Sequence, residues 1–110
     1  MDRLEVARDC YRAWQTADRD LVERLLADEF AFHSPPDPIL DRAGYFERCW
    51  PHAGATRSFD FKRLQDIGNG EVLVTYEATT TDGRRLRNTE VLTIPEDRIT
   101  RVEVYFGWNL

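Results

Sequence analysis

The sequence predicts an α+β fold in which helices come first and an antiparallel sheet follows. Apolar residues recur every three or four positions in the first half of the chain, and strand-like segments separated by short turns fill the second half. Hydrophobic residues make up 42% of the 110 residues, which is enough for one core under a charged surface. We therefore expect residues 1–110 to form a single domain.

Two helices are expected near the start of the chain. Residues 4–14 place their apolar side chains on one face of a helix. Residues 21–26 carry a second, shorter apolar stripe, and this helix should end near Asp28. Either Asp18 or Asp20 can cap its N-terminus, because both precede the stripe.

The next two elements are a strand and a third helix. Residues 30–34 have the aromatic content of a strand, and a proline-rich segment ending at Pro38 stops it, because proline cannot donate to a ladder. Asp41 is expected to cap the helix that follows. This helix should end before Pro51, since the residue preceding a proline avoids the helical conformation.

The second half predicts a meander of four strands. They are separated by the turn sequences Gly-Asn-Gly, Asp-Gly and Pro-Glu-Asp, and short turns join antiparallel neighbours. The predicted strands are residues 57–67, 71–81, 84–94 and 99–108.

The Asp-Gly turn determines which side chains share a face. If Asp82 and Gly83 form a two-residue turn, Thr81 pairs with Arg84, and side chains alternate outward from that pair. One face then carries Leu73, Thr75, Glu77, Thr79, Leu86, Asn88, Glu90 and Leu92. The other carries Val72, Val74, Tyr76, Ala78, Arg87, Thr89 and Val91. Periodicity alone leaves open which of the two faces points inward.

Several segments resemble SnoaL-like and ketosteroid-isomerase-like proteins of the NTF2-like superfamily. They are TADRDL (16–21), LADEF (26–30) and FHSP (32–35), together with the last two strands over 90–94 and 98–106. The resemblance implies an NTF2-like (cystatin-like) cone, in which three N-terminal helices pack on a curved antiparallel or mixed sheet and enclose a pocket.

The resemblance also implies roles for individual residues. Glu90 matches the protonated acid of the isomerase oxyanion hole, and Phe106 matches a pocket-lining aromatic residue. The general-base carboxylate of the family is replaced by Ser34, which cannot remove a proton from carbon unaided. The oxyanion-hole tyrosine on the first helix is replaced by Cys10. The fold is therefore better specified than the reaction.

The candidate catalytic residues are Glu90, Asn88 and Glu77, on the face that the resemblance places inside. A carboxylic acid in a pocket of low dielectric can have its pKa raised enough to stay protonated and donate a hydrogen bond to a developing enolate oxygen, and Glu77 and Glu90 could also act as acid and base. The alternative is that each glutamate is only tied to a buried donor such as Arg57 or Arg63. The predicted pocket lining is Trp14, Phe32, Ser34, Tyr45, Trp50, Thr75, Val104 and Phe106.

Other reactive side chains have weaker support. His33 and His52 could supply a base, because imidazole titrates near neutral pH, but each could equally be structural. Cys10 and Cys49 lack the close spacing of metal sites, and we expect reduced, inert thiols. The sequence predicts neither a metal nor another cofactor.

These observations lead to one main hypothesis and two alternatives. The main one is a pocket for a small hydrophobic ligand, carbonyl-bearing or polycyclic, with isomerisation, cyclisation or hydration by acid–base chemistry. One alternative is a non-catalytic ligand-binding or accessory protein. The other is a module that works through protein–protein contacts and whose pocket is filled by its own core side chains.

The expected partners and location follow from charge and hydropathy. The net charge of -5 is spread without a basic stripe, which argues against nucleic acid as a partner. No apolar run reaches about 18 residues and no secretory signal is visible, so we expect no membrane partner and a cytoplasmic location. A homodimer is expected through an outer sheet face that carries Val74, Tyr76, Val91 and Tyr105.

Overall fold

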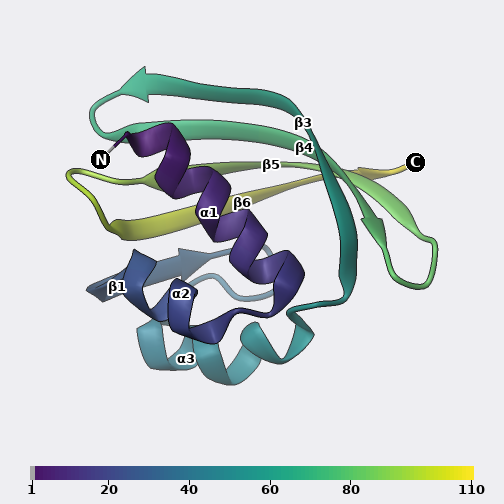
Figure 1. The fold of residues 1–110 in the computed structure, drawn as a ribbon, viewed down its shortest axis with the longest axis horizontal. Coiled ribbons are helices and arrows are strands. Elements are labelled where there is room, and N and C mark those ends of the chain that lie inside the picture. Colours follow the sequence, from purple (N-terminus) through teal and green to yellow (C-terminus); the bar gives the residue numbers. More distant parts are fainter. Residues whose placement is uncertain (1) are drawn as a thin grey trace.

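The computed structural model describes residues 2–110 and has helices packed on one side of a curved sheet (Figure 1). The helices are α1 (Arg3–Thr16), α2 (Arg19–Leu25) and α3 (Arg42–Arg48), followed by a 3-10 turn (Trp50–His52). The strands are β1 (Leu26–His33), β2 (Leu40–Asp41), β3 (Thr56–Gly68), β4 (Glu71–Thr80), β5 (Arg85–Thr93) and β6 (Ile99–Asn109).

Aspartates cap the N-termini of the helices. The carboxylates of Asp2, Asp18 and Asp41 each accept a backbone N–H from the first turn of α1, α2 and α3. Asp18, not Asp20, is therefore the cap of α2. α1 ends at Thr16, and the next residue, Ala17, caps it with a φ of 54° in the left-handed region. None of the helices within residues 2–110 has the length and apolar content needed to cross a membrane.

The sheet is mixed, with the strand order β2-β1-β6-β5-β4-β3. β1 pairs in parallel with β6, and the other neighbours are antiparallel. β1 begins at Leu26, four residues earlier than predicted, because Leu26 already pairs with Ile99 of β6. The two-residue strand β2 was not expected from the sequence. Helices cover the concave face, while the end of the β4–β5 hairpin extends beyond them (Figure 1).

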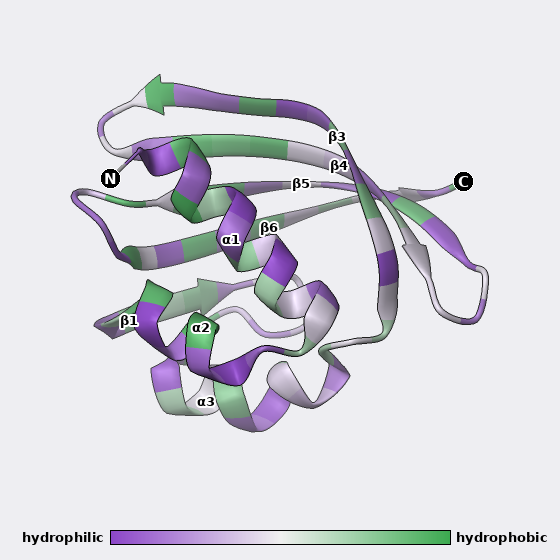
Figure 2. Ribbon diagram, viewed as in Figure 1, coloured by the Kyte–Doolittle hydropathy of each residue, from purple (hydrophilic) through white to green (hydrophobic). Residues whose placement is uncertain are grey.

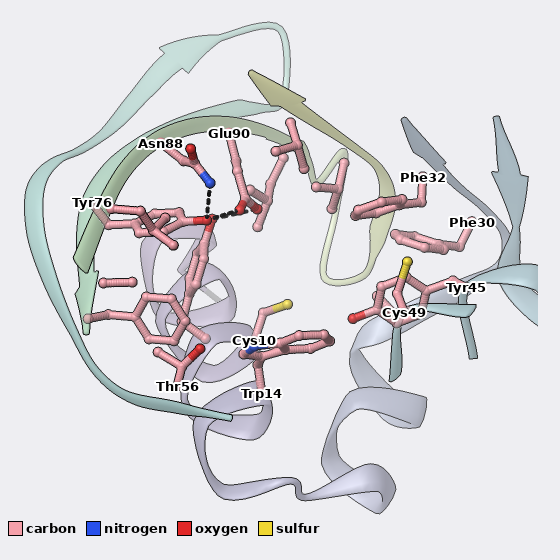
Figure 3. A pocket seen from close by; sticks show the side chains of 18 of the residues that line it. Cys10, Trp14, Phe30, Phe32, Tyr45, Cys49, Thr56, Tyr76, Asn88 and Glu90 are labelled. Carbon is pink, nitrogen blue, oxygen red and sulfur yellow. Dashed lines mark hydrogen bonds between the residues drawn. The ribbon is translucent and has the colours of Figure 1, made fainter. Parts of the chain in front are cut away.

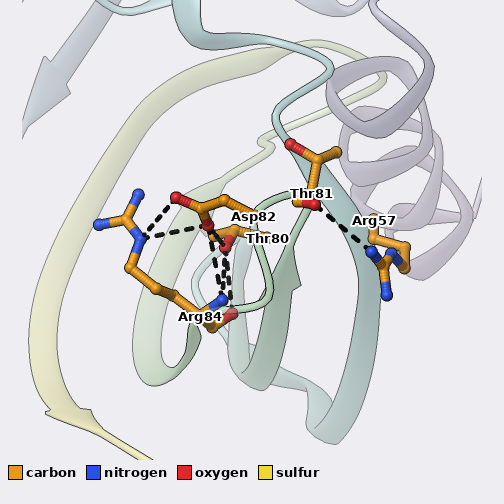
Figure 4. Close-up of polar contacts among 5 residues, drawn as sticks. All are labelled: Arg57, Thr80, Thr81, Asp82 and Arg84. Carbon is orange, nitrogen blue, oxygen red and sulfur yellow. Dashed lines mark hydrogen bonds and ion pairs between the residues drawn. The ribbon is translucent and has the colours of Figure 1, made fainter.

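The predicted register of the β4–β5 hairpin is wrong by one residue. The N–H of Thr80 donates to the carbonyl of Arg84 at 2.8 Å, which leaves a three-residue loop rather than a two-residue turn. Gly83 occupies the left-handed position of this loop, with φ at 90°. The hydroxyl of Thr80 donates to Asp82 and accepts the N–H of Arg84, and these contacts stabilise the longer loop (Figure 4).

This shift reverses the faces of β4 relative to the prediction. Val74 now pairs with Glu90, and Tyr76 pairs with Asn88, so Val74 and Tyr76 are buried beneath the helices. Thr75 and Glu77 lie on the opposite, convex face. The predicted outer position of Val74 and Tyr76 and the predicted inner position of Thr75 and Glu77 are therefore wrong.

The hydrophobic core lies between the helices and the concave face of the sheet. Its fully buried large side chains are Phe30, Leu26, Leu92, Ile94, Ile99, Val6, Val22, Val72 and Val74. The helix α1 alternates between hydrophobic and hydrophilic residues around its circumference, as expected for a helix with one side on a core (Figure 2). The core is continuous with a pocket, because Leu26, Phe30 and Leu92 belong to the core and also line the pocket.

Candidate functional site

A pocket of about 230 Å³ lies between α1, α3 and the concave face of the sheet (Figure 3). Most of its lining is apolar or aromatic, and Glu90 is its only carboxyl group within residues 2–110. The side chains that carry polar or sulfur atoms are Cys10, Tyr11, Trp14, Tyr45, Cys49, Thr56, Tyr76, Thr80, Asn88 and Glu90. The pocket is therefore largely hydrophobic, with one acidic centre.

Two tyrosines hold the Glu90 carboxyl group from opposite sides. The hydroxyl of Tyr11, on α1, donates to Oε1 at 3.0 Å. The hydroxyl of Tyr76, on β4, donates to Oε2 at 2.6 Å. The Tyr76 distance is in the range of charge-assisted O–H···O⁻ hydrogen bonds. Both oxygens of Glu90 are thus fixed by donors from different elements.

The surroundings shift the pKa values of this cluster. Burial raises the pKa of Glu90, while the hydrogen bonds from Tyr76 and Tyr11 act in the opposite direction. Burial and the charge of Glu90 raise the pKa of both tyrosines. The tyrosines therefore remain protonated donors, and Glu90 is the group in the cluster that can exchange a proton.

Asn88, on β5, extends the network to the neighbouring strand β6. Its Oδ1 accepts the backbone N–H of Gly107 at 3.1 Å, which orients the amide. Its Nδ2 then points to the hydroxyl of Tyr76 at 3.5 Å. A side chain at Gly107 would place Cβ 2.1 Å from the carbonyl oxygen of Arg87, so the β-bulge here requires glycine.

Aromatic rings and two thiols form the other side of the pocket. Tyr45, on α3, packs edge-to-face on Phe30 at a centroid distance of 5.3 Å, and its hydroxyl points toward the pocket interior (Figure 3). Cys10 and Cys49 also line the pocket. Burial raises the pKa of the Cys10 thiol to about 12, and burial also raises that of Cys49. Both thiols are therefore weak nucleophiles near neutral pH.

A family profile places this architecture in a known group. The profile of the SnoaL-like domain matches residues 7–102. The chain belongs to the SnoaL-like domain family. Comparison with curated proteins gives no significant match.

Solved structures share the NTF2-like fold of this SnoaL-like domain. An NTF2-like protein of unknown function from Cytophaga hutchinsonii ATCC 33406 matches with a TM-score of 0.76 and 16% identity, over 97% of this chain and 91% of that one. An M. tuberculosis LEH-like epoxide hydrolase matches with a TM-score of 0.74 and 18% identity, over 96% and 82%. A candidate ketosteroid isomerase from Kribbella flavida DSM 17836 matches with a TM-score of 0.78 and 18% identity, over 96% and 77%. Such identities establish the fold alone.

Six of the residues predicted for the site line the pocket of this SnoaL-like domain. They are Trp14, Phe32, Tyr45, Asn88, Glu90 and Val104. Asn88 and Glu90 lie there because alternate residues of β5 face the helices, as the family resemblance implied.

The other predicted site residues lie elsewhere. Thr75 bonds to Thr89 on the convex face at 2.9 Å, and Glu77 pairs there with Arg87. Ser34 forms a backbone turn with Asp37, outside the pocket lining. The remaining residues outside the lining are Trp50, which packs on Trp14 at 5.8 Å, and Phe106, which is 59% exposed.

Neither histidine lines the pocket, so neither is positioned as its base. The ring nitrogen Nδ1 of His33 lies 2.7 Å from the carbonyl of Pro38, and His52 ends the 3-10 turn. Within residues 2–110, no group of three or more His, Cys, Asp or Glu side chains is arranged to hold a metal ion.

Sequence reasoning missed the two tyrosines that hold Glu90. Tyr11 belongs to the apolar stripe of α1 together with Cys10 and Trp14, and this spacing already places all three on one face. Tyr76 was assigned to the wrong face by the turn register. A three-residue turn would have placed Tyr76 beside Glu90.

Proposed function

We propose that the pocket binds a small, neutral, hydrophobic molecule with an oxygen acceptor such as a carbonyl. We propose further that Glu90 removes a proton from this molecule and returns it. The observation that supports this most directly is a single carboxyl group held by two tyrosine hydroxyls in an otherwise hydrophobic pocket. The proposed reaction is an isomerisation, cyclisation or hydration by acid–base chemistry.

The hydrogen bonds favour a proton-accepting role for Glu90. Both tyrosines donate to it, and this arrangement suits the ionised carboxylate. Burial raises the pKa of Glu90, which makes the carboxylate a stronger base than an exposed one. The family base position, Ser34, lies outside the pocket lining, so Glu90 takes the part that Ser34 cannot perform.

A non-catalytic binding protein is the second candidate. Among residues 2–110 the lining offers only one carboxyl group, so a reaction that needs two carboxyl groups as separate acid and base lacks one of them. The same pocket could then recognise its ligand without transferring a proton.

Hydrogen–deuterium exchange distinguishes these functions. The protein is incubated in D₂O with cyclohexanone or 2-indanone, and loss of the α-proton signals is followed by ¹H NMR. We expect exchange with the wild type and none above background with Glu90→Gln, whose folding is checked by circular dichroism. Binding without exchange would identify a binding protein. If neither ketone binds, the proposed pocket function is rejected.

A further inference from the structure

We propose that Tyr45 binds the oxygen atom of the ligand, donating a hydrogen bond from the side of the pocket that lies across from Glu90. This inference rests on the proposed function and adds an orientation to it. The carbonyl oxygen would point to α3, and the carbon that loses its proton would point to β5.

The hydroxyl of Tyr45 is available for this role. Within residues 2–110 it makes no hydrogen bond, whereas Tyr11 and Tyr76 both donate to Glu90. The residue is only 7% exposed, yet its hydroxyl lines the pocket and points into it (Figure 3). The hydroxyl is not among the enclosed, unpaired atoms of the described residues, so it is accessible from the pocket and a ligand oxygen can accept its hydrogen bond.

The ring of Tyr45 is held rigidly enough to aim the hydroxyl. It contacts Phe30, Phe32 and Phe46 at centroid distances of 5.3, 5.4 and 5.5 Å. These contacts come from β1 and from α3 itself, so the ring cannot turn away without disturbing the core. The donor is therefore preorganised, as a group that stabilises a developing negative charge must be.

The hydroxyl also stays protonated. Burial raises the pKa of Tyr45, and the nearby thiols and the charge of Glu90 raise it further. The contribution of Glu90 means that the two groups interact electrostatically across the pocket. The side-chain amide of Asn88, which also lines the pocket, already bonds to Gly107 and Tyr76.

These positions define a balanced proton transfer. The carboxylate of Glu90 takes a proton from the carbon next to the carbonyl, and the electron pair of the broken C–H bond forms the C=C bond of an enolate. The charge moves to the ligand oxygen, where the hydroxyl of Tyr45 stabilises it. Glu90 then returns the proton to the same carbon or to a conjugated one, so no other reactant is consumed.

The pocket volume limits the size of this ligand. An engineered cavity of about 150 Å³ accommodates benzene, so by proportion a pocket of 230 Å³ holds about nine non-hydrogen atoms. A single-ring or fused two-ring ketone fits this volume. A four-ring polycyclic ligand would have to extend through the pocket mouth.

The test compares Tyr45→Phe with wild type, using 2-indanone labelled with ¹³C at the carbonyl. This substitution removes one oxygen and leaves the ring contacts, and its folding is checked by thermal unfolding. We expect the exchange rate of the α-protons to fall roughly 100-fold, the effect typical of losing one such donor. The carbonyl infrared band of the bound ketone should shift to higher frequency as its hydrogen bond is lost.

Two further variants separate the possible outcomes. Tyr105→Phe removes a hydroxyl from an exposed residue outside the pocket lining and should leave the carbonyl band in place. Glu90→Gln should abolish exchange and keep the band near its wild-type position. Exchange that needs Glu90 but is unchanged in Tyr45→Phe would overturn this inference alone, and absence of exchange in the wild type would overturn the proposed catalytic function.

Discussion

Replacing Tyr76 by phenylalanine should destabilise the protein by an amount that depends on pH. The substitution removes the hydroxyl that donates to Oε2 of Glu90 at 2.6 Å and keeps the ring, which packs edge-to-face on Phe59 at 5.1 Å. When Glu90 is ionised, the lost bond is charge-assisted and is worth about 1.5–3 kcal/mol. When Glu90 is protonated, the bond joins neutral groups and is worth about 0.5–1.5 kcal/mol.

The measurement is urea unfolding of wild type and variant at two pH values. One lies well above the raised pKa of Glu90 and the other lies below 4.5, the ordinary value of a glutamate. The loss of unfolding free energy should be larger at the higher pH, because only there is the acceptor charged. Tyr105→Phe, which removes a hydroxyl from a residue that is 54% exposed, is the matched control and should change little. Equal losses for Tyr76→Phe at both pH values would refute an ionised Glu90 as acceptor.

Four other predictions concern the acidic centre, a thiol and the convex face. Because burial raises the pKa of Glu90, the wild type should lose stability relative to Glu90→Gln as the pH rises from 4.5 through that raised pKa; a difference independent of pH would contradict this. Cys10, whose pKa is about 12, should react with iodoacetamide at pH 8 far more slowly in the folded protein than in urea, and equal rates would place it outside the pocket. Glu77→Gln leaves Lys62, Arg85 and Arg87 without their shared partner and should lower the unfolding free energy by about 1–2 kcal/mol. Ligand binding should persist in this variant, and its loss would indicate that Glu77 contacts the ligand. Sedimentation equilibrium should give a homodimer that Tyr105→Glu dissociates, and a monomeric wild type at micromolar concentration would count against pairing through this face.

The helices were predictable because their signals are local. Apolar spacing located α1 and α2, and the caps Asp18 and Asp41 lie directly before the helices that they begin. β2 was not predictable in this way, since it has two residues and exists only because Leu40 and Asp41 meet β1. Its pairing depends on contacts that no short window of sequence contains.

The site was predictable on one strand and not on its neighbour. The family resemblance oriented β5 and placed Asn88 and Glu90 on the pocket side. The orientation of β4 had to be inferred from that of β5 by counting residues across the turn. Because the loop has one residue more than assumed, Tyr76 and not Glu77 faces the pocket. The hydrogen bonds of Thr80 that hold the longer loop involve ordinary side chains, and the Asp-Gly sequence is itself typical of two-residue turns.

The three-residue loop at 81–83 restricts how this protein can evolve. Exposed loops usually tolerate insertions and deletions, because little packing depends on their length. Here the loss of one loop residue, with β5 kept in place, would slide β4 by one position, bring Glu77 beneath the helices and expel Val74. Loop length at this hairpin should therefore be under purifying selection as strict as that on a core side chain, and Gly83, with its φ of 90°, should be constrained along with it.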